Sequence, residues 1–175
     1  MKTNRILIVS LLLIFLLISG CKQYNSEVKK VIKGDYRNEG IEVSLYTQGI
    51  TSHTLIYDLE SISNTNSMAD IFRVFLQMAD SLKNEKFDYV YIAFRGKTKF
   101  IIKGEYFQQL GQEYSWQNPV YTIRNFPSNV FNIDGSPAYG AWEGGVLGVL
   151  QKEMEDFTDF NKKWYLNDLG YQAKE

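Results

Sequence analysis

Alternation of apolar and polar residues in the first half of the chain predicts β-strands. Apolar side chains occupy every second position over residues 41–46, and the alternation returns over residues 53–58 after a turn that contains Gly49. The stretch FDYVYIAF, residues 87–94, is apolar at almost every position, which is typical of a central strand buried on both faces. The RGKT turn after it leads into a partner strand over residues 99–103, so these two strands are expected to form a hairpin.

Helical spacing of apolar residues predicts three helices. Over residues 68–82 the apolar positions recur every three or four residues, and Ser67 with Asp70 forms a capping box with Asp in place of the usual Glu or Gln. A short helix is predicted over residues 105–114 and a long amphipathic helix over residues 146–164. Each of these helices has an apolar face that is suited to covering a sheet.

Residues 118–137 contain all three prolines and predict a long ordered loop with a short strand around residues 120–123. Strands that pair through hairpins, with helices between and after them, predict an α+β fold. We expect a mainly antiparallel sheet of about four to six strands packed with about three helices. The pattern does not determine the order of the strands.

An apolar run near the N-terminus differs from these patterns because it is apolar on every side of a helix. Lys2 and Arg5 precede the run, which spans about 13 residues from Ile6 to Ile18 and is interrupted by Ser10. This length matches the hydrophobic segment of a signal peptide and falls short of the ~20 residues that span a bilayer. The run therefore predicts a signal peptide.

The residues that end this run, Ile18-Ser19-Gly20-Cys21, resemble the lipobox of bacterial lipoproteins. The resemblance implies cleavage before Cys21, a diacylglyceryl thioether on its sulfur, and acylation of the new amino terminus by groups such as palmitate. Several acyl chains, at ~0.8 kcal/mol per buried methylene, anchor a protein stably to a membrane. The alternative is a secreted protein whose mature chain begins with Cys.

Three parts of the chain follow from this interpretation. We expect a cleaved signal peptide over residues 1–20, a lipidated N-terminus and short linker over residues 21–39, and a single globular α+β domain over residues 40–175. A folded domain that begins close to the bilayer remains an alternative to the linker. Lys22 stands where Asp commonly signals inner-membrane retention, so the resemblance favours the periplasmic face of the outer membrane in a two-membrane bacterium.

Composition narrows the chemistry of the mature chain. Loss of residues 1–20 removes Lys2 and Arg5, so 17 basic and 20 acidic residues remain and the formal net charge becomes −3, which argues against nucleic acid as a partner. Cys21 is the single cysteine, so the domain is expected to fold without disulfides. His53 is the single histidine and suits a structural or solvated strand position, so neither a metal site nor another cofactor is predicted.

Two motifs with possible chemistry have simpler explanations. The stretch EGGVLG, residues 143–148, matches neither of the glycine-rich phosphate-binding patterns, so its glycines are expected to let the chain turn before a helix. Glu105 and Glu113 are about two helical turns apart, and solvated helix charges are their expected role. No catalytic residue is assigned.

Two groups of residues are candidates for binding a partner. Cations gather around the hairpin turn, where strand alternation would place Lys97, Lys99 and Lys103 on one side, to meet anionic headgroups or an acidic partner, or to block edge pairing. Aromatic residues gather in residues 114–142, where they can stack on sugars, dock a protein, or pin a long loop to the core. The binding candidates are Arg95, Lys97, Lys99, Trp116, Tyr121 and Arg124.

These observations favour a membrane-anchored lipoprotein of the cell envelope that acts as a non-enzymatic binding or interaction module. Its expected partners are the membrane, through the lipid anchor, and an envelope protein or a cell-wall component. One alternative is an envelope hydrolase with an unrecognised carboxylate site. Another is an immunity-type lipoprotein that neutralises a toxin.

Overall fold

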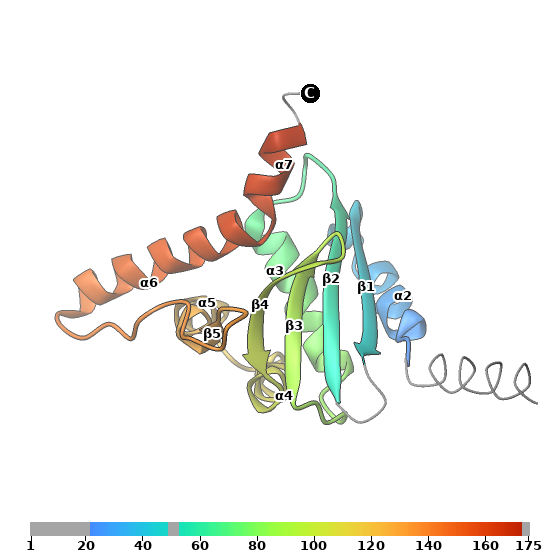
Figure 1. Cartoon of the computed structure of the whole chain (residues 1–175), viewed down its shortest axis with the longest axis horizontal. Helices are drawn as coiled ribbons and strands as arrows, with labels where there is room; N and C mark the ends of the chain where they lie inside the picture. The colour runs from blue at the N-terminus through green and yellow to red at the C-terminus, as the bar shows by residue number, and fades with distance from the viewer. Residues whose placement is uncertain (1–21, 49–52, 173–175) are drawn as a thin grey trace, which may run out of the picture.

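The structure is a computed structural model that describes residues 22–48 and 53–172, and within them five strands form one sheet (Figure 1). The strands lie across the sheet in chain order. Neighbouring strands are antiparallel except β2 and β3, which are parallel. The predicted α+β fold with a mainly antiparallel sheet is therefore confirmed. The strands are β1 (Ile41–Gln48), β2 (Thr54–Ile62), β3 (Tyr89–Phe94), β4 (Lys97–Lys103) and β5 (Val130–Phe131).

Helix α3, Met68–Ser81, joins the two parallel strands. Parallel neighbours need a crossover rather than a tight turn, and a helix is its usual form. The Ser67 N–H donates to Asp70 Oδ2 at 2.8 Å, and the Asp70 N–H donates to Ser67 Oγ at 3.2 Å, so the predicted helix and its capping box are confirmed. Hydrogen bonds from the Ser67 hydroxyl and backbone, with a further one from Arg73, lower the pKa of Asp70 to about 2.

One face of the sheet, which we call the covered face, packs against helices and forms the core. Helix α3 lies on this face together with α4 (Gly104–Glu113), the short helix predicted near this position, and α6 (Val146–Asn161). The ring centroid of Phe75 in α3 lies 4.9 Å from that of Tyr57 in β2 and 5.6 Å from that of Phe107 in α4. Figure 1 shows the strands in front of α2 and α3, with the opposite face of the sheet toward the viewer.

The predicted hairpin between β3 and β4 is confirmed. Its turn residues, Arg95 at φ 50° and Gly96 at φ 75°, both lie in the left-handed region, as two-residue hairpin turns often require. Asp58 of β2 reaches the turn, where its Oδ2 accepts a hydrogen bond from the Gly96 N–H at 2.8 Å. The pairing of β3 with β4 shifts by one residue between Ile92 and Ala93, so β4 carries a bulge.

The chain is folded onto the domain from Lys22, which corrects the expected linker over residues 21–39. Tyr24 is a buried core residue, and its N–H donates to Leu45 O of β1 at 2.9 Å. Asn38 is also buried, and its Nδ2 donates to the side chain of Gln77 in α3 at 2.6 Å. The lipobox and the predicted turn at Gly49 lie outside the described residues. The elements of this segment are α2 (Asn25–Gly34) and the 3-10 turn η1 (Tyr36–Asn38).

Residues 118–137 contain a helix, α5, Pro119–Asn125, so the prediction of a short strand around residues 120–123 is wrong. Asn118 caps this helix, because its side chain accepts a hydrogen bond from the Val120 N–H at 2.9 Å. An Asn cap followed by Pro at the first helical position is a strong helix-start signal, and it outweighs the strand propensity of the apolar residues after it. The 3-10 turn η2 (Pro127–Asn129) then leads into β5.

The long helix predicted near the C-terminus is confirmed as α6, which a π-helical turn, η3 (Lys162–Leu166), joins to α7 (Asn167–Gln172). The turn places Trp164 in the core, where its Nε1–H donates to Ala93 O of β3 at 2.8 Å. In residues 22–48 and 53–172, no helix has the length and apolar character that crossing a membrane requires.

Candidate functional site

A continuous row of apolar and aromatic side chains crosses the sheet on the face opposite α3, which we call the open face. The register pairs each member of the row with the next: Tyr46 with Ile56, Ile56 with Tyr91, Tyr91 with Ile101, and Ile101 with Phe131. Residues that are direct partners on adjacent strands point to the same side of a sheet. The row therefore places three aromatic rings on a surface that the described helices do not cover.

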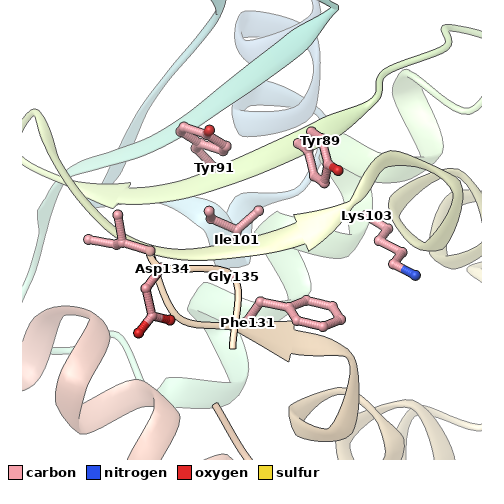
Figure 2. Close-up of a pocket in the computed structure, with 8 residues that line it drawn as sticks. Tyr89, Tyr91, Ile101, Lys103, Phe131, Asp134 and Gly135 are labelled. Atoms are coloured by element: carbon pink, nitrogen blue, oxygen red, sulfur yellow. The ribbon is translucent and has the colours of Figure 1, made fainter. Parts of the chain in front are cut away.

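A hollow of about 310 Å³ lies on this surface over β3, β4 and β5 (Figure 2). Figure 2 shows Tyr89 and Tyr91 on neighbouring outward positions of β3, with Phe131 on the other side of β4. Tyr89 is 50% exposed, and Ile101 lies between the rings of β3 and Phe131. The floor of the hollow is therefore aromatic and apolar, while remaining open to solvent.

The loop after β5 forms a wall of this hollow. Ile133, Asp134 and Gly135 line it. The loop is closed by a hydrogen bond of 2.8 Å from the Asn132 N–H to Ser136 O, and Gly135 at φ 84° supplies the left-handed conformation that the turn needs. The wall thus comes from a short ordered turn.

A second hollow of about 470 Å³ adjoins the first, and both are lined by Tyr89 and Lys103. Asp88 and Glu105 also line the second hollow. We call the two hollows, which share Tyr89 and Lys103 as lining residues, the trough. It extends from Asp134 beside β5 to Glu105 at the start of α4.

The trough has charged groups of both signs around its aromatic floor. Lys103 Nζ lies 5.9 Å from the ring centroid of Phe131, within the range of a cation–π contact. Asp134 Oδ1 accepts a hydrogen bond from the Ser136 hydroxyl at 2.6 Å, and this bond holds the pKa of Asp134 below its usual value. Asp88 and Glu105 add two more carboxylates. The site therefore offers a hydrogen-bond donor, several acceptors and flat apolar surfaces.

The aromatic candidates Trp116 and Tyr121 lie outside the trough. Trp116 follows α4 and is 68% exposed, and Tyr121 lies in α5 and is 53% exposed. Neither lines either of the two hollows. They remain candidates for a separate contact surface.

The basic candidates differ in their contacts. Arg124 Nε lies 2.6 Å from Glu153 Oε2, and Lys99 Nζ lies 2.7 Å from Asp168 Oδ2, so ion pairs hold both side chains. Arg95 and Lys97 are exposed at the hairpin tip. Three of these cations thus lie at or beside the turn between β3 and β4, whereas Arg124 lies in α5.

The expected common side of Lys97, Lys99 and Lys103 is also corrected. Lys97 pairs with Phe94, whereas Lys103 pairs with Tyr89 on the open face. The bulge in β4 lies between these positions, and one extra residue reverses the alternation of side chains. Lys103 is therefore the lysine of this group that reaches the trough.

One part of the trough has a signal in the sequence. In FDYVYIAF, the two tyrosines alternate with Val90 and Ile92, so the hydroxyl-bearing rings share one side of β3. The contribution of Phe131 was not readable, because it depends on a two-residue strand at the sheet edge.

Metal binding has no support in residues 22–48 and 53–172, where no cluster of three or more His, Cys, Asp or Glu side chains is placed to hold an ion. His53 is exposed and precedes β2, and its carbonyl accepts from the Asp88 N–H at 2.9 Å. Of the two glutamates on α4, Glu105 borders the trough, whereas Glu113 accepts a hydrogen bond from Gln109 at 2.9 Å.

Comparisons of the chain with protein-family models, with curated proteins and with solved structures found no match.

Proposed function

We propose that the chain is a membrane-anchored lipoprotein of the bacterial cell envelope and that the trough is its non-enzymatic binding site for an envelope partner. The observation that carries the binding proposal is the group of aromatic side chains over β3 to β5, where Tyr89 is 50% exposed and Tyr91 and Phe131 are half-buried, on a sheet whose other face is packed against helices. Exposed apolar surface of this kind costs solubility and commonly marks a binding site. The lipobox resemblance of Ile18-Ser19-Gly20-Cys21 supports the anchor.

The position of Lys22 supports a short connection between an anchor and the folded domain. The Lys22 N–H donates to Thr47 Oγ1 at 2.9 Å, and the Thr47 N–H donates to Lys22 O at 2.8 Å. Lys22 Nζ also lies 3.0 Å from Glu85 Oε1. An acyl group on the preceding residue would be one peptide unit, about 3.8 Å between Cα atoms, from a residue bonded to the sheet. The domain would then lie against the bilayer surface.

This connection also indicates which end of the sheet is nearer to the membrane. Thr47 lies near the end of β1, and the row Gln48, Thr54, Tyr89 and Lys103 runs across the sheet at that same end. The second hollow therefore opens on the membrane side, toward the lower edge of the sheet in Figure 1. The hairpin tip lies at the other end of β3, roughly 17 Å away at ~3.3 Å per residue, which argues against a role for the hairpin cations in binding the anchoring bilayer.

The anchor is tested by replacing the proposed acylation site in the full chain. With Cys21→Ser, we expect loss of metabolic labelling by palmitate and retention of the uncleaved leader, measured by mass spectrometry of the protein isolated from cells. Ser26→Ala is the matched control, because Ser26 is an exposed residue of α2 and its change should leave labelling intact. Equal labelling of the Cys21→Ser variant would contradict the lipoprotein proposal.

The binding role is tested by crosslinking the anchored protein in cells and identifying captured molecules by mass spectrometry. Tyr89→Ala should reduce capture, because Tyr89 lines both hollows. Tyr36→Ala is the control, since Tyr36 is 86% exposed in η1 and lies outside the trough. Undiminished capture by Tyr89→Ala would contradict the trough as the binding site.

A further inference from the structure

We infer that the ligand of the trough is a polymeric saccharide, a glycan strand of the cell wall. This inference rests on the proposed binding function of the trough and specifies its ligand class.

The floor offers flat rings to a ligand that has both apolar and polar sides. Tyr89 and Tyr91 are two residues apart on β3, so their rings are spaced by ~7 Å along the strand, and Phe131 lies across β4. Sugar rings present C–H groups on their faces and hydroxyls around their edges. Aromatic side chains with a polar tip, as in tyrosine, suit such ligands because they supply apolar contact area and a hydrogen-bonding hydroxyl together.

The rim of the trough supplies hydrogen-bond partners for the hydroxyls of a sugar ring. Asp88, Glu105 and Asp134 are acceptors, and the Lys103 ammonium is a donor. A hydroxyl both donates and accepts, so a polyhydroxylated ligand can satisfy acceptors and donors around one site. Because the rim carries both positive and negative groups, it does not favour a ligand of high net charge.

An extended peptide fits this surface less well. The backbone groups of the floor are already paired within the sheet, because Tyr89 pairs with Lys103 and Tyr91 with Ile101. A peptide lying on these side chains could not pair its own N–H and C=O groups with β3 or β4, and unpaired backbone groups are costly when buried. The linkages of a sugar chain carry no N–H groups, and its hydroxyl and acetamido groups lie at the ring edges, where they can reach the donors and acceptors of the rim.

An acyl chain is also a poor fit. Filling the trough with hydrocarbon would remove water from the charged groups of Lys103, Asp134 and Glu105 without giving them new partners. Burial of a charge without a partner is strongly unfavourable, more so than burial of an unpaired neutral polar group.

The shape favours a chain over a single sugar. The two hollows have Tyr89 and Lys103 in common, and each is open to solvent rather than enclosed. Two adjoining open hollows can take neighbouring units of one chain that continues beyond them. We therefore assign the trough to a glycan strand rather than to a free mono- or disaccharide.

The test uses the full-length lipoprotein purified in detergent and three probes: insoluble cell-wall sacculi in a sedimentation assay, soluble β-1,4-linked N-acetylglucosamine oligomers in calorimetry, and free N-acetylglucosamine. We expect cosedimentation with sacculi, binding of the longer oligomers, and at least tenfold weaker binding of the monosaccharide. Tyr89→Ala and Tyr91→Ala should each weaken binding about tenfold, and Asp134→Asn about threefold. Tyr36→Ala should leave binding unchanged.

Other outcomes would overturn the inference in distinguishable ways. If sacculi and oligomers do not bind, while crosslinked capture in cells still requires Tyr89, the trough binds a partner of another class, such as a polypeptide, and only the saccharide assignment fails. If capture does not require Tyr89 either, the proposed function fails with it. If free N-acetylglucosamine binds as tightly as the oligomers, the polymer assignment is wrong. Since Tyr89 is half exposed, its variant keeps the test valid even if Tyr91→Ala disturbs folding.

Discussion

Both faces of the sheet carry aromatic residues, but those on the covered face are buried in the core and those on the open face border solvent. On the covered face, Tyr57 is enclosed by Phe75 and Trp164, whose ring centroids lie 4.9 and 5.9 Å away. On the open face, Tyr89 and Tyr91 stand on β3 beside solvent, and the register alone aligns them with the neighbouring strands. Aromatic content therefore does not distinguish the core from the binding site. The core and the binding site differ in whether a helix packs over their aromatic residues.

The largest expected effect concerns aromatic truncation on the two faces. Phe75→Ala on the covered face should lower the free energy of unfolding by about 3–5 kcal/mol, because it leaves a cavity among packed rings. Tyr91→Ala on the open face should cost about 1 kcal/mol, mainly through lost cross-strand contacts. Urea unfolding of the purified protein, followed by circular dichroism, measures both. A cost for Tyr91→Ala as large as that for Phe75→Ala would remove the distinction between the faces.

The next effect tests how tightly the helices on the covered face approach each other. A Cβ on Gly111 of α4 would collide with the Ala79 carbonyl of α3, so Gly111→Ala should destabilise the protein by about 1–3 kcal/mol. Gly148 of α6 has open space around it, and Gly148→Ala should stabilise by up to about 1 kcal/mol, because alanine favours a helix. Thermal unfolding of both variants compares them. Equal shifts for the two variants would show that α3 and α4 are not in close contact.

A smaller effect concerns the start of α3, the helix that joins the parallel strands on the covered face. Ser67→Ala removes the cap and should cost about 1 kcal/mol. Because the folded-state pKa of Asp70 is lowered to about 2, its stabilising contribution is present above its usual value near 4 and is lost as the pH falls toward 2. The variant should therefore show a weaker loss of stability over that acid range, measured by urea unfolding at a series of pH values. An unchanged acid dependence would count against the capping box.

The smallest effect concerns Asp58, which is buried on the open face beneath the hairpin turn. Burial raises the pKa of Asp58, so the folded state binds its proton more tightly than the unfolded state does. Its contribution to stability is therefore complete below pH ~4 and declines as the pH rises through the raised value. Asp58→Asn can still accept from the Gly96 N–H and should make stability less dependent on pH above 4. A steeper decline in the variant, measured by the same unfolding series, would contradict the raised pKa.

Much of the fold was predictable because local patterns and local structure coincide. Strand alternation over β1, the capping box of α3 and the turn between β3 and β4 each depend on residues within about ten positions of one another, and each is confirmed. The error at α5 also has a local explanation, since the Asn118–Pro119 start signal was present in the sequence and strand propensity was given more weight.

The trough was less predictable because it is assembled by long-range pairing. Tyr89 and Phe131 are far apart in the chain and meet only because β4 lies between them, paired with both β3 and β5. The position of Lys103 depends on a bulge, which the alternation of residues did not reveal. The segment after Lys22 likewise joined the fold through pairing with β1 rather than through its own polar composition.

By itself the sequence determined the α+β class, the main helices and strands, the net charge and the resemblance of the N-terminus to a lipoprotein signal, because periodicity, capping and composition act over short distances along the chain. Only the tertiary structure decided which tyrosines are core and which are exposed, that β2 and β3 are parallel, and where the trough lies. The physical reason is that burial and register depend on which distant strand or helix packs against a residue, and no local pattern specifies that partner.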